Sequence, residues 1–299
     1  MKILKNVNEV EWQTGRFRLD LNTPKVMGIV NVTPDSFSDG GQHASRDAAL
    51  AHCDRLLKDG ADILDIGGES TRPGAQELPV AEELERVLPV VRHAVTLGVP
   101  ISVDTYKPQV MQAALDLGAD IINDVWALRW TGDPSGQTGA DVVRQHANCG
   151  VCLMHMHRNP QTMQSAPMEG DVVPQVLSFL EQLTQHLRGL GVDSARICID
   201  PGIGFGKTVQ QNFTLLAQQA AFLPLGYAVM AGWSRKSPLA AVTQRSLSTV
   251  ATLDIRDRLV PSVTAALLAV QNGAHVVRVH DVKETVQALK VFSAMQQQC

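Results

Sequence analysis

The sequence predicts an α/β protein with a single (β/α)8 TIM barrel, and three observations support this prediction. Eight short apolar runs, nearly all of which follow closely on a Gly or Pro, alternate with helix-length segments. The runs are nearly continuous in Val and Ile, which is typical of parallel strands covered on both faces. The 299 residues also match one barrel of roughly 250 residues with some extensions.

The expected strands are the apolar runs themselves, and most of them begin after a glycine that ends the preceding helix. Their ranges are 25–31, 61–67, 99–104, 119–124, 151–155, 195–200, 227–232 and 274–280. Helices are expected between them, and several open with proline in the first turn, where its missing N–H costs nothing. The helical ranges include 47–59, 79–96, 108–117, 172–190 and 262–272. An open doubly wound sheet is the alternative, but eight units without a topological break favour the closed barrel.

The domain organisation follows from this pattern. Residues 1–24 are expected to form a short polar N-terminal extension, and residues 25–299 the barrel. Long connections at 32–46, 68–78 and 125–141 follow the first, second and fourth strands, at the end of a barrel where loops build pockets.

Composition excludes several classes of protein. The formal net charge of −4 argues against a general nucleic-acid surface, and no stretch reaches the roughly 18 unbroken apolar residues of a membrane span. The five cysteines are scattered, and the lone pair Cys149 and Cys152 lacks a second CxxC to complete a zinc site. We therefore expect a cytoplasmic protein whose cysteines serve packing.

Two loops carry groups suited to a charged ligand. Asn31 opens a segment dense in oxygen ligands, and its amide could hold Mg²⁺ together with substrate phosphates, although Thr33-Pro34-Asp35 also fits a simple turn. Residues 67–74 offer backbone amides, hydroxyls and the Arg72 guanidinium, which suit a phosphate or carboxylate unless the loop is only a solvated turn.

The sixth strand ends in Asp200, followed by a glycine-rich segment that resembles a phosphate-binding loop. Pro201 occupies the position of a required glycine, and Lys207 that of another, so neither nucleotide motif is satisfied. What remains is an acid followed by a turn that lets backbone approach a flat ligand closely.

Cationic side chains follow the last two strands. Arg235 and Lys236 precede a helix that Ser237 can cap, and Arg278 and His280 share one side of the final strand. These groups predict a diphosphate clamp. His155 and His157 form an HxH that could bind zinc, but a strand-end histidine bonded to its neighbours is the favoured interpretation.

Eight segments in order together resemble the dihydropteroate synthase family. They cover residues 27–41, 65–74, 102–105, 123–125, 154–156, 200–207, 234–237 and 278–282. The resemblance implies a TIM barrel, usually a homodimer, that condenses 7,8-dihydropterin-6-ylmethyl diphosphate with 4-aminobenzoate to give dihydropteroate and diphosphate. Two features depart from the family pattern: Arg158, where the family often has glycine, and the long segment 126–140.

The resemblance also implies site residues. The pterin contacts are Asp104, Asn123, Met154, Asp200 and Lys236. The diphosphate contacts are Asn31, Thr71, Arg72, Arg278 and His280, with Asn31 also binding Mg²⁺. The 4-aminobenzoate contacts are Phe37, Thr71, Pro73, Phe205 and Ser237.

A dissociative displacement is the expected mechanism, with Asp104, Lys236 and Arg278 as the catalytic residues. Mg²⁺ and the cationic side chains stabilise the departing diphosphate, and no covalent enzyme intermediate is required. Three alternatives stay open: a pterin barrel that transfers methyl groups from methyltetrahydrofolate, a zinc hydrolase built on His155 and His157, and a catalytically idle pterin-binding or scaffolding protein.

Overall fold

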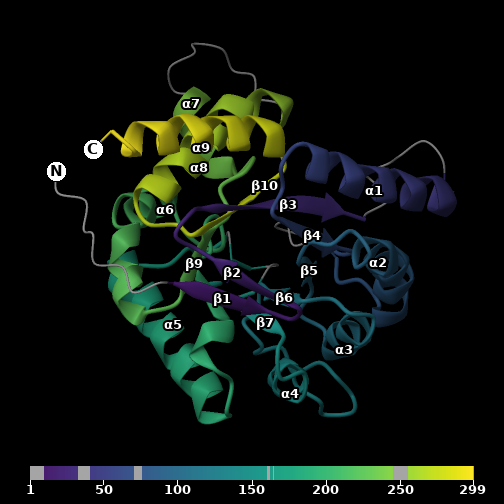
Figure 1. The fold of residues 1–299 in the computed structure, drawn as a ribbon. Coiled ribbons are helices and arrows are strands. Elements are labelled where there is room, and N and C mark those ends of the chain that lie inside the picture. Colours follow the sequence, from purple (N-terminus) through teal and green to yellow (C-terminus); the bar gives the residue numbers. More distant parts are fainter. Residues whose placement is uncertain are drawn as a thin grey trace.

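A closed barrel of parallel strands forms the body of the molecule. The computed structural model describes residues 10–32, 41–70, 76–159, 162–163, 165–244 and 255–298. Within these ranges eight parallel strands close in the order β10-β3-β4-β5-β6-β7-β8-β9, and helices surround them (Figure 1). The predicted (β/α)8 barrel is therefore confirmed, and the open doubly wound sheet is excluded.

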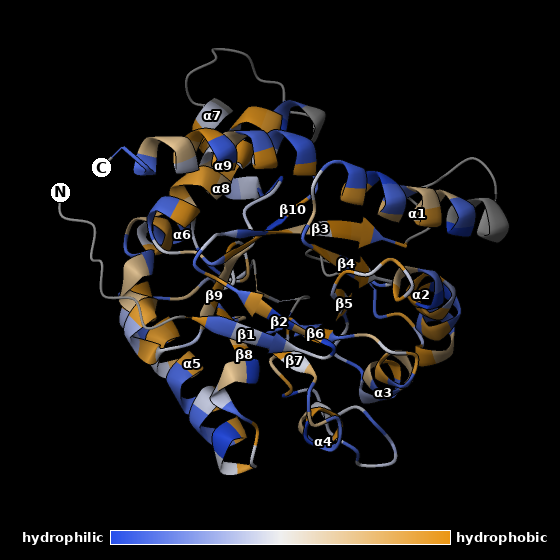
Figure 2. Ribbon diagram, viewed as in Figure 1, coloured by the Kyte–Doolittle hydropathy of each residue, from blue (hydrophilic) through white to orange (hydrophobic). Residues whose placement is uncertain are grey.

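The barrel strands coincide with the eight predicted runs. They are β3 (Lys25–Asn31), β4 (Ile63–Gly67), β5 (Ile101–Asp104), β6 (Ile121–Asp124), β7 (Gly150–Met154), β8 (Ile197–Asp200), β9 (Ala228–Ala231) and β10 (Val276–Val279). Several strands are almost wholly apolar, as β3 and β4 show in Figure 2. This composition fits strands that face the barrel interior on one side and the helices on the other.

Helices connect and cover the strands. They are α1 (Gly41–Lys58), α2 (Val80–Ala94), α3 (Pro108–Asp116), α4 (Gly139–Gln145), α5 (Val172–Gly189), α6 (Val209–Ala217), α7 (Ser237–Gln244), α8 (Leu259–Gln271) and α9 (Val282–Gln296). Short 3-10 helices occur at η2 (Ser194–Arg196), η3 (Gln219–Leu225) and η4 (Ile255–Arg258). None of these described helices combines the length and the apolar character that crossing a membrane requires.

Local capping chemistry sets where several helices begin. Thr208 accepts a hydrogen bond from the Gln211 backbone N–H and begins α6, while Thr138 caps α4 in the same way. Helix α1 begins at Gly41, so the connection predicted over 32–46 is shorter than expected. Helix α8 begins at Leu259, three residues before the predicted start, because η4 leads into it.

Strand alternation divides the barrel interior into two layers. An apolar layer fills the amino end and contains Met27, Ile63, Ile121, Cys152, Cys198 and Val276. The residues two positions further along the same strands include Asp65, Asn123, Met154, Asp200 and Arg278. Alternate residues of a strand point to the same face. Each of these strands therefore contributes an apolar side chain to the amino end of the barrel interior and, two residues later, a side chain to its carboxyl end, where most are polar.

The buried cysteines near the apolar layer test the prediction that the CxxC residues serve packing. Cys152 and Cys198 are register partners on β7 and β8, and Cys149 lies buried just before β7. Burial raises the pKa of the Cys149 thiol to about 11, so it stays protonated at neutral pH. The packing interpretation of these residues is confirmed.

A hairpin closes the amino end of the barrel. Strands β1 (Glu11–Thr14) and β2 (Phe17–Asp20) pair antiparallel and lie across the barrel opening (Figure 1). Trp12 is fully buried in the apolar layer, and its indole N–H donates to the Arg196 carbonyl at 3.0 Å. Arg16 pairs with the buried Asp120 at 2.8 Å. This part of the N-terminal extension is therefore a structured lid on the core, which the polar composition of residues 1–24 did not indicate.

Candidate active site

Arg278 links two carboxylates at the carboxyl end of the barrel interior. Its Nε donates to Asp65 Oδ2 at 2.6 Å, and its Nη2 donates to Asp104 Oδ2 at 2.7 Å. Asn123 Nδ2 donates to the same Asp65 oxygen at 3.2 Å. Side chains from β10, β4, β5 and β6 thus form one connected polar network.

The charges of this network depend on one another. Burial opposes the charge of Arg278, but Asp65 and Asp104 outweigh this effect and raise its pKa. Burial raises the pKa of Asp104, while the Arg278 guanidinium opposes that shift. The Asp65 atom Oδ1 is buried and makes no hydrogen bond within the described part of the chain. An acceptor of this kind suits a ligand N–H.

Strand register brings the remaining predicted residues to the same end. Asn31 pairs with Gly67, Gly67 with Asp104, and Asp104 with Asn123, while Met154 pairs with Asp200. Burial raises the pKa of Asp200, and the Gly202 N–H and Lys236 ammonium oppose that shift. Lys236 also opposes the rise in the pKa of Asp104, so its charge acts on carboxylates from both β5 and β8.

The turn after β8 requires glycine at two positions. Gly202 adopts a φ of +72°, and a Cβ there would lie 1.8 Å from the His155 carbonyl oxygen. Gly206 adopts a φ of +70°, and its Cβ would meet His157 Cβ at 2.6 Å. The turn therefore packs directly on the end of β7 and presents Phe205 beside Lys236, whose Nζ lies 4.3 Å from the ring centroid.

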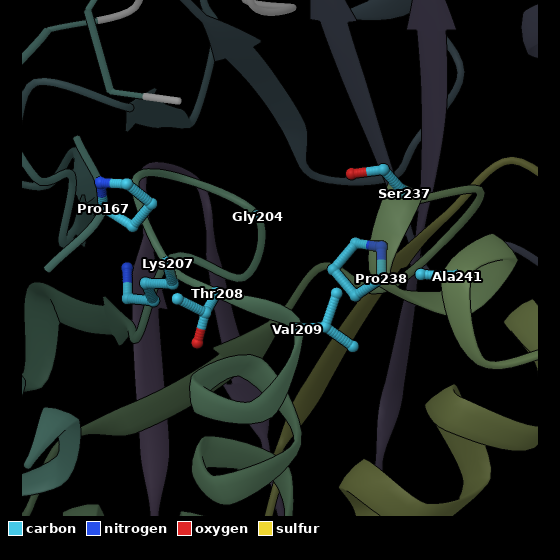
Figure 3. Close-up of a pocket in the computed structure, with 8 residues that line it drawn as sticks. All are labelled: Pro167, Gly204, Lys207, Thr208, Val209, Ser237, Pro238 and Ala241. Atoms are coloured by element: carbon cyan, nitrogen blue, oxygen red, sulfur yellow. The ribbon is translucent and has the colours of Figure 1, made fainter. Parts of the chain in front are cut away.

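A cavity of about 230 Å³ adjoins this turn (Figure 3). It lies between the first residues of α6 and α7, where helix N-termini favour negative charge. Ser237 and Pro238 come from α7, Val209 begins α6, and Lys207 and Thr208 immediately precede α6. Gly204 lines the cavity too, next in sequence to Phe205, so Ser237 and the Phe205 turn share one region.

Of the four predicted cations of the clamp, Arg235 is separated from Lys236, Arg278 and His280. Arg278 points into the barrel, and His280 Nδ1 lies 3.0 Å from Ser234 Oγ. Arg235 instead turns away through a φ of 60° and pairs with Asp281 at 2.6 Å. The clamp prediction is wrong for Arg235, because Asp281 at the start of α9 already neutralises it.

Four predicted residues, Phe37, Thr71, Arg72 and Pro73, lie outside the described residues. The zinc alternative finds no support in the described ranges, where no three His, Cys, Asp or Glu side chains gather to hold a metal. His155 is bonded to Lys207 at 2.9 Å, as its favoured interpretation predicted. Arg158 adopts a φ of 63°, a backbone conformation that glycine adopts without strain. This conformation explains why glycine is often found at this position in the family pattern.

An aromatic cluster borders the site and was not predicted. Tyr106, Met154 and Phe205 pack together with further methionines, and Trp126 and Trp130 cover them. The Trp130 and Tyr106 ring centroids are 5.5 Å apart. The long segment after β6 therefore builds one apolar wall beside the network. The two tryptophans of this segment were the sequence feature that could have indicated the wall, because large aromatic side chains are uncommon in a loop exposed to solvent.

Comparison with known proteins identifies relatives over nearly the whole chain. The family model "Pterin binding enzyme" matches residues 27–280. A dihydropteroate synthase of Neisseria meningitidis serogroup C is 46% identical over 287 residues, covering 95% of this chain and 97% of the relative. The dihydropteroate synthase of Escherichia coli K12 is 44% identical over 277 residues, covering 92% and 93%.

Solved structures agree with these matches. The chain resembles Xanthomonas albilineans dihydropteroate synthase with 4-aminobenzoic acid at a TM-score of 0.86 and 46% identity, covering 97% of this chain and 99% of that one. It resembles Burkholderia cenocepacia dihydropteroate synthase complexed with 7,8-dihydropteroate at a TM-score of 0.83 and 47% identity, covering 96% and 97%.

The buried Asp124 carboxyl at the base of the aromatic wall makes the stability of the protein depend on pH. Asp124 is fully buried and accepts hydrogen bonds from the Trp126 and Leu128 N–H groups, each at 2.7 Å. Burial raises its pKa from 3.8 to about 7, although these two N–H groups oppose the shift. Between those values the folded protein binds more protons than the unfolded chain. This carboxyl therefore makes the protein less stable as pH rises from 4 to 7.

Asp124→Asn mimics the protonated carboxyl and should lose this dependence. We expect its free energy of unfolding, relative to wild type, to improve by on the order of 3 kcal/mol between pH 4 and pH 7.5. Urea unfolding at several pH values measures the difference. Parallel stability curves for the two proteins would show that Asp124 is ionised throughout.

Proposed function

The chain belongs to the dihydropteroate synthases, transferases of the pterin-binding enzyme family, and on that premise we propose that it joins 7,8-dihydropterin-6-ylmethyl diphosphate to 4-aminobenzoate. The products are 7,8-dihydropteroate and diphosphate. The observation that carries the proposal is the convergence of Asp104, Asn123, Asp200 and Arg278 at one end of the barrel. These groups match a flat heterocycle with an anionic tail.

The pterin ring presents an amino group beside a ring N–H, and a carboxylate accepts both at once. We assign this role to Asp200, which is buried on β8 and oriented by the Gly202 N–H at 2.7 Å. Asn123 and Lys236 supply further polar contacts. Met154, the register partner of Asp200, packs on the ring face.

Asp65 joins the predicted set as a positioning residue. It accepts from both Arg278 and Asn123, and therefore orients one side chain of the diphosphate set and one of the pterin set. Its place on β4, two residues after the inward-facing Ile63, was a signal for an inward side chain.

The diphosphate is assigned to Asn31, Thr71, Arg72, Arg278 and His280. Arg278 has five N–H groups, of which two bond to carboxylates, so further donors of the same guanidinium can face the leaving group. Asn31 lies half-buried at the end of β3, and a single amide oxygen fits Mg²⁺, which takes few protein ligands beside phosphates and water. When bound, Mg²⁺ would neutralise charge on the departing diphosphate.

The 4-aminobenzoate is assigned to the region of Phe205 and Ser237, together with Phe37, Thr71 and Pro73. The cavity between α6 and α7 supports this assignment, since helix N-termini and the Ser237 hydroxyl suit a carboxylate. The arylamine is neutral at pH 7, so its lone pair needs no strong base.

Three side chains then divide the work of a dissociative displacement. Arg278 stabilises negative charge as the carbon–oxygen bond to the diphosphate breaks. Asp104 faces the positive charge that develops on the exocyclic carbon and ring. Lys236 holds the pterin and balances Asp104 and Asp200. The amine nitrogen forms the new bond and releases its proton to solvent.

Incubation with both substrates and Mg²⁺ tests the function directly. We expect dihydropteroate to form, and removal of Mg²⁺ by EDTA to lower the rate by about 100-fold until Mg²⁺ is restored. Chromatographic detection of dihydropteroate measures both effects. Absence of product would refute the function, while full activity in EDTA would refute only the role of the metal.

Substitutions of Arg278 and Arg235 test which of these two arginines contributes to catalysis. Arg278→Lys keeps a charge between Asp65 and Asp104 but cannot bridge them, and we expect kcat to fall by about 10³-fold. Arg235→Met removes the neighbouring cation that pairs with Asp281, and kcat should change less than about threefold because that pair lies outside the network. Steady-state kinetics on folded protein measures both. Equal losses in the two variants would contradict the assignment of Arg278.

We further propose a homodimer, located in the cytoplasm, that uses the neighbouring helices α7, α8 and α9. Large apolar side chains are exposed on these helices: Val242, Val260, Leu268, Val291 and Met295. Val260 is 73% exposed, which is unfavourable for a face that meets only water. We expect light scattering to give twice the chain mass for wild type and the single mass for Val260→Asp. A monomeric wild type would refute the dimer.

A further inference from the structure

We propose that Lys207 is a positioning residue, whose buried side-chain nitrogen fixes the turn from Gly202 to Gly206 and thereby orients Asp200 and Phe205. This inference builds on the proposed function, since Asp200 and Phe205 are the residues assigned there to the pterin and to 4-aminobenzoate. The glycine-rich segment resembles a phosphate-binding loop in sequence, and its lysine has no part in the proposed function.

The Lys207 nitrogen is surrounded by acceptors from the chain itself. Nζ donates to the Gly202 carbonyl at 2.7 Å and to the Phe205 carbonyl at 3.1 Å. His155 supplies its Nδ1 at 2.9 Å and its carbonyl oxygen at 3.4 Å. The residue is only 4% exposed. An ammonium has three N–H groups, so these acceptors use all of them and no phosphate is needed to satisfy the side chain.

The neutral imidazole of His155 accepts a hydrogen bond from this lysine. Burial, followed by the charge of Lys207, lowers the pKa of His155 to about 2, so the imidazole is neutral at pH 7. Burial lowers the pKa of Lys207 to about 7, and the charge of Asp200 opposes that shift. In its charged form the lysine can only donate, so Nδ1 carries the lone pair and Nε2 carries the proton. The His155 and Phe179 rings pack edge to face with their centroids 4.8 Å apart, which restrains the orientation of the imidazole. The first histidine of the HxH motif thus serves Lys207 and not a metal.

The turn held by Lys207 depends on its anchors, because only Ile203 and Phe205 in it carry side chains, both of them buried. Three of its five residues, Gly202, Gly204 and Gly206, adopt positive φ angles and carry no side chain. Such a segment has many accessible conformations, and an external anchor selects one of them. Lys207 bonds to the carbonyls at two points of the turn, and Asn212 accepts the Gly204 N–H at 2.7 Å between them.

Both assigned substrate residues are coupled to these anchored peptides. The Gly202 residue donates its N–H to Asp200 Oδ1 at 2.7 Å, while its carbonyl accepts from Lys207. The Phe205 carbonyl accepts from Lys207, and its ring lies under the Lys236 ammonium. Loss of Lys207 therefore removes a hydrogen bond from the Phe205 carbonyl and one from the Gly202 residue that orients the Asp200 carboxylate.

Arg196 offers a matched control at the opposite end of the barrel. It is a buried cation that donates to the carbonyls of Cys149 at 2.7 Å, Val143 at 2.6 Å and His146 at 2.9 Å. Its side chain joins the chain before β7 to the chain before β8, on the side where the hairpin lies. Arg196→Met should destabilise the protein much as Lys207→Met does, without touching the turn.

The experiment compares Lys207→Met with Arg196→Met in two measurements. We expect Lys207→Met to raise KM for 4-aminobenzoate by about tenfold or more, a factor consistent with the loss of charged hydrogen bonds, and Arg196→Met to leave it within about twofold. Hydrogen exchange of the peptide spanning residues 201–208 should accelerate in Lys207→Met alone. Because Lys207 also lines the cavity assigned to 4-aminobenzoate, the exchange rate is the deciding measurement. Unchanged exchange in Lys207→Met, whatever its KM, or equal changes in both variants, would overturn the proposal.

A second pair of variants covers the case in which Lys207→Met does not fold. His155→Leu removes the Nδ1 acceptor, whereas His155→Asn keeps an acceptor near the same position. We expect KM for 4-aminobenzoate and the exchange rate of the turn to rise in His155→Leu and to recover largely in His155→Asn. Identical behaviour of these two variants would refute the inference. Exchange is measured without substrate, so its outcome stands even if wild type forms no dihydropteroate.

Discussion

The bridge from Arg278 to Asp65 and Asp104 is the interaction on which the polar end of the barrel depends. Buried carboxylates are costly unless a cation and hydrogen bonds compensate them. Arg278 provides both, and it reaches from the last strand of the barrel to the second and third, across the β10–β3 seam where the barrel closes. The same guanidinium therefore links strands on both sides of this seam and neutralises buried carboxylates of the site.

This arrangement also limits how the site can change. With Asp65 and Asp104 already bonded, the guanidinium is fixed in direction before any ligand arrives, and the remaining donors need little reorganisation to meet an anion. Burial, reinforced by the charge of Asp65, raises the pKa of Asp104, and Asp65 Oδ1 is a buried acceptor with no hydrogen bond among the described residues. A ligand that brings N–H donors would satisfy that acceptor.

Sequence reasoning reached the strands and their ends because a single physical rule governs both. Hydrophobic runs of strand length locate the barrel, and the two-residue period of a strand then separates inward from outward side chains. Asp104, Asn123, Asp200 and Arg278 follow from that rule. The barrel, with its eight strands in register within the described ranges, confirms it.

The features that sequence reasoning missed depend on pairing between distant residues. Arg235 follows the same strand end as Lys236, but a left-handed residue reverses its direction toward Asp281, which no local pattern reveals. The hairpin is short and flanked by charges, so only its contact with the barrel opening shows that Trp12 belongs to the core. The bond between Lys207 and His155 spans 52 residues of sequence and needs the fold to form first.

Lys207 and Arg196 show how position decides what a buried cation does. Both side chains donate to backbone carbonyls and lose hydration in exchange, so their local chemistry is alike. At the amino end such a side chain ties loops to a dry apolar layer, and its effect ends with stability. At the carboxyl end the bonded carbonyls belong to a glycine turn beside Asp200 and Lys236. The same hydrogen bonds there, together with the buried side chains of Ile203 and Phe205, define the shape of a surface that a ligand would meet.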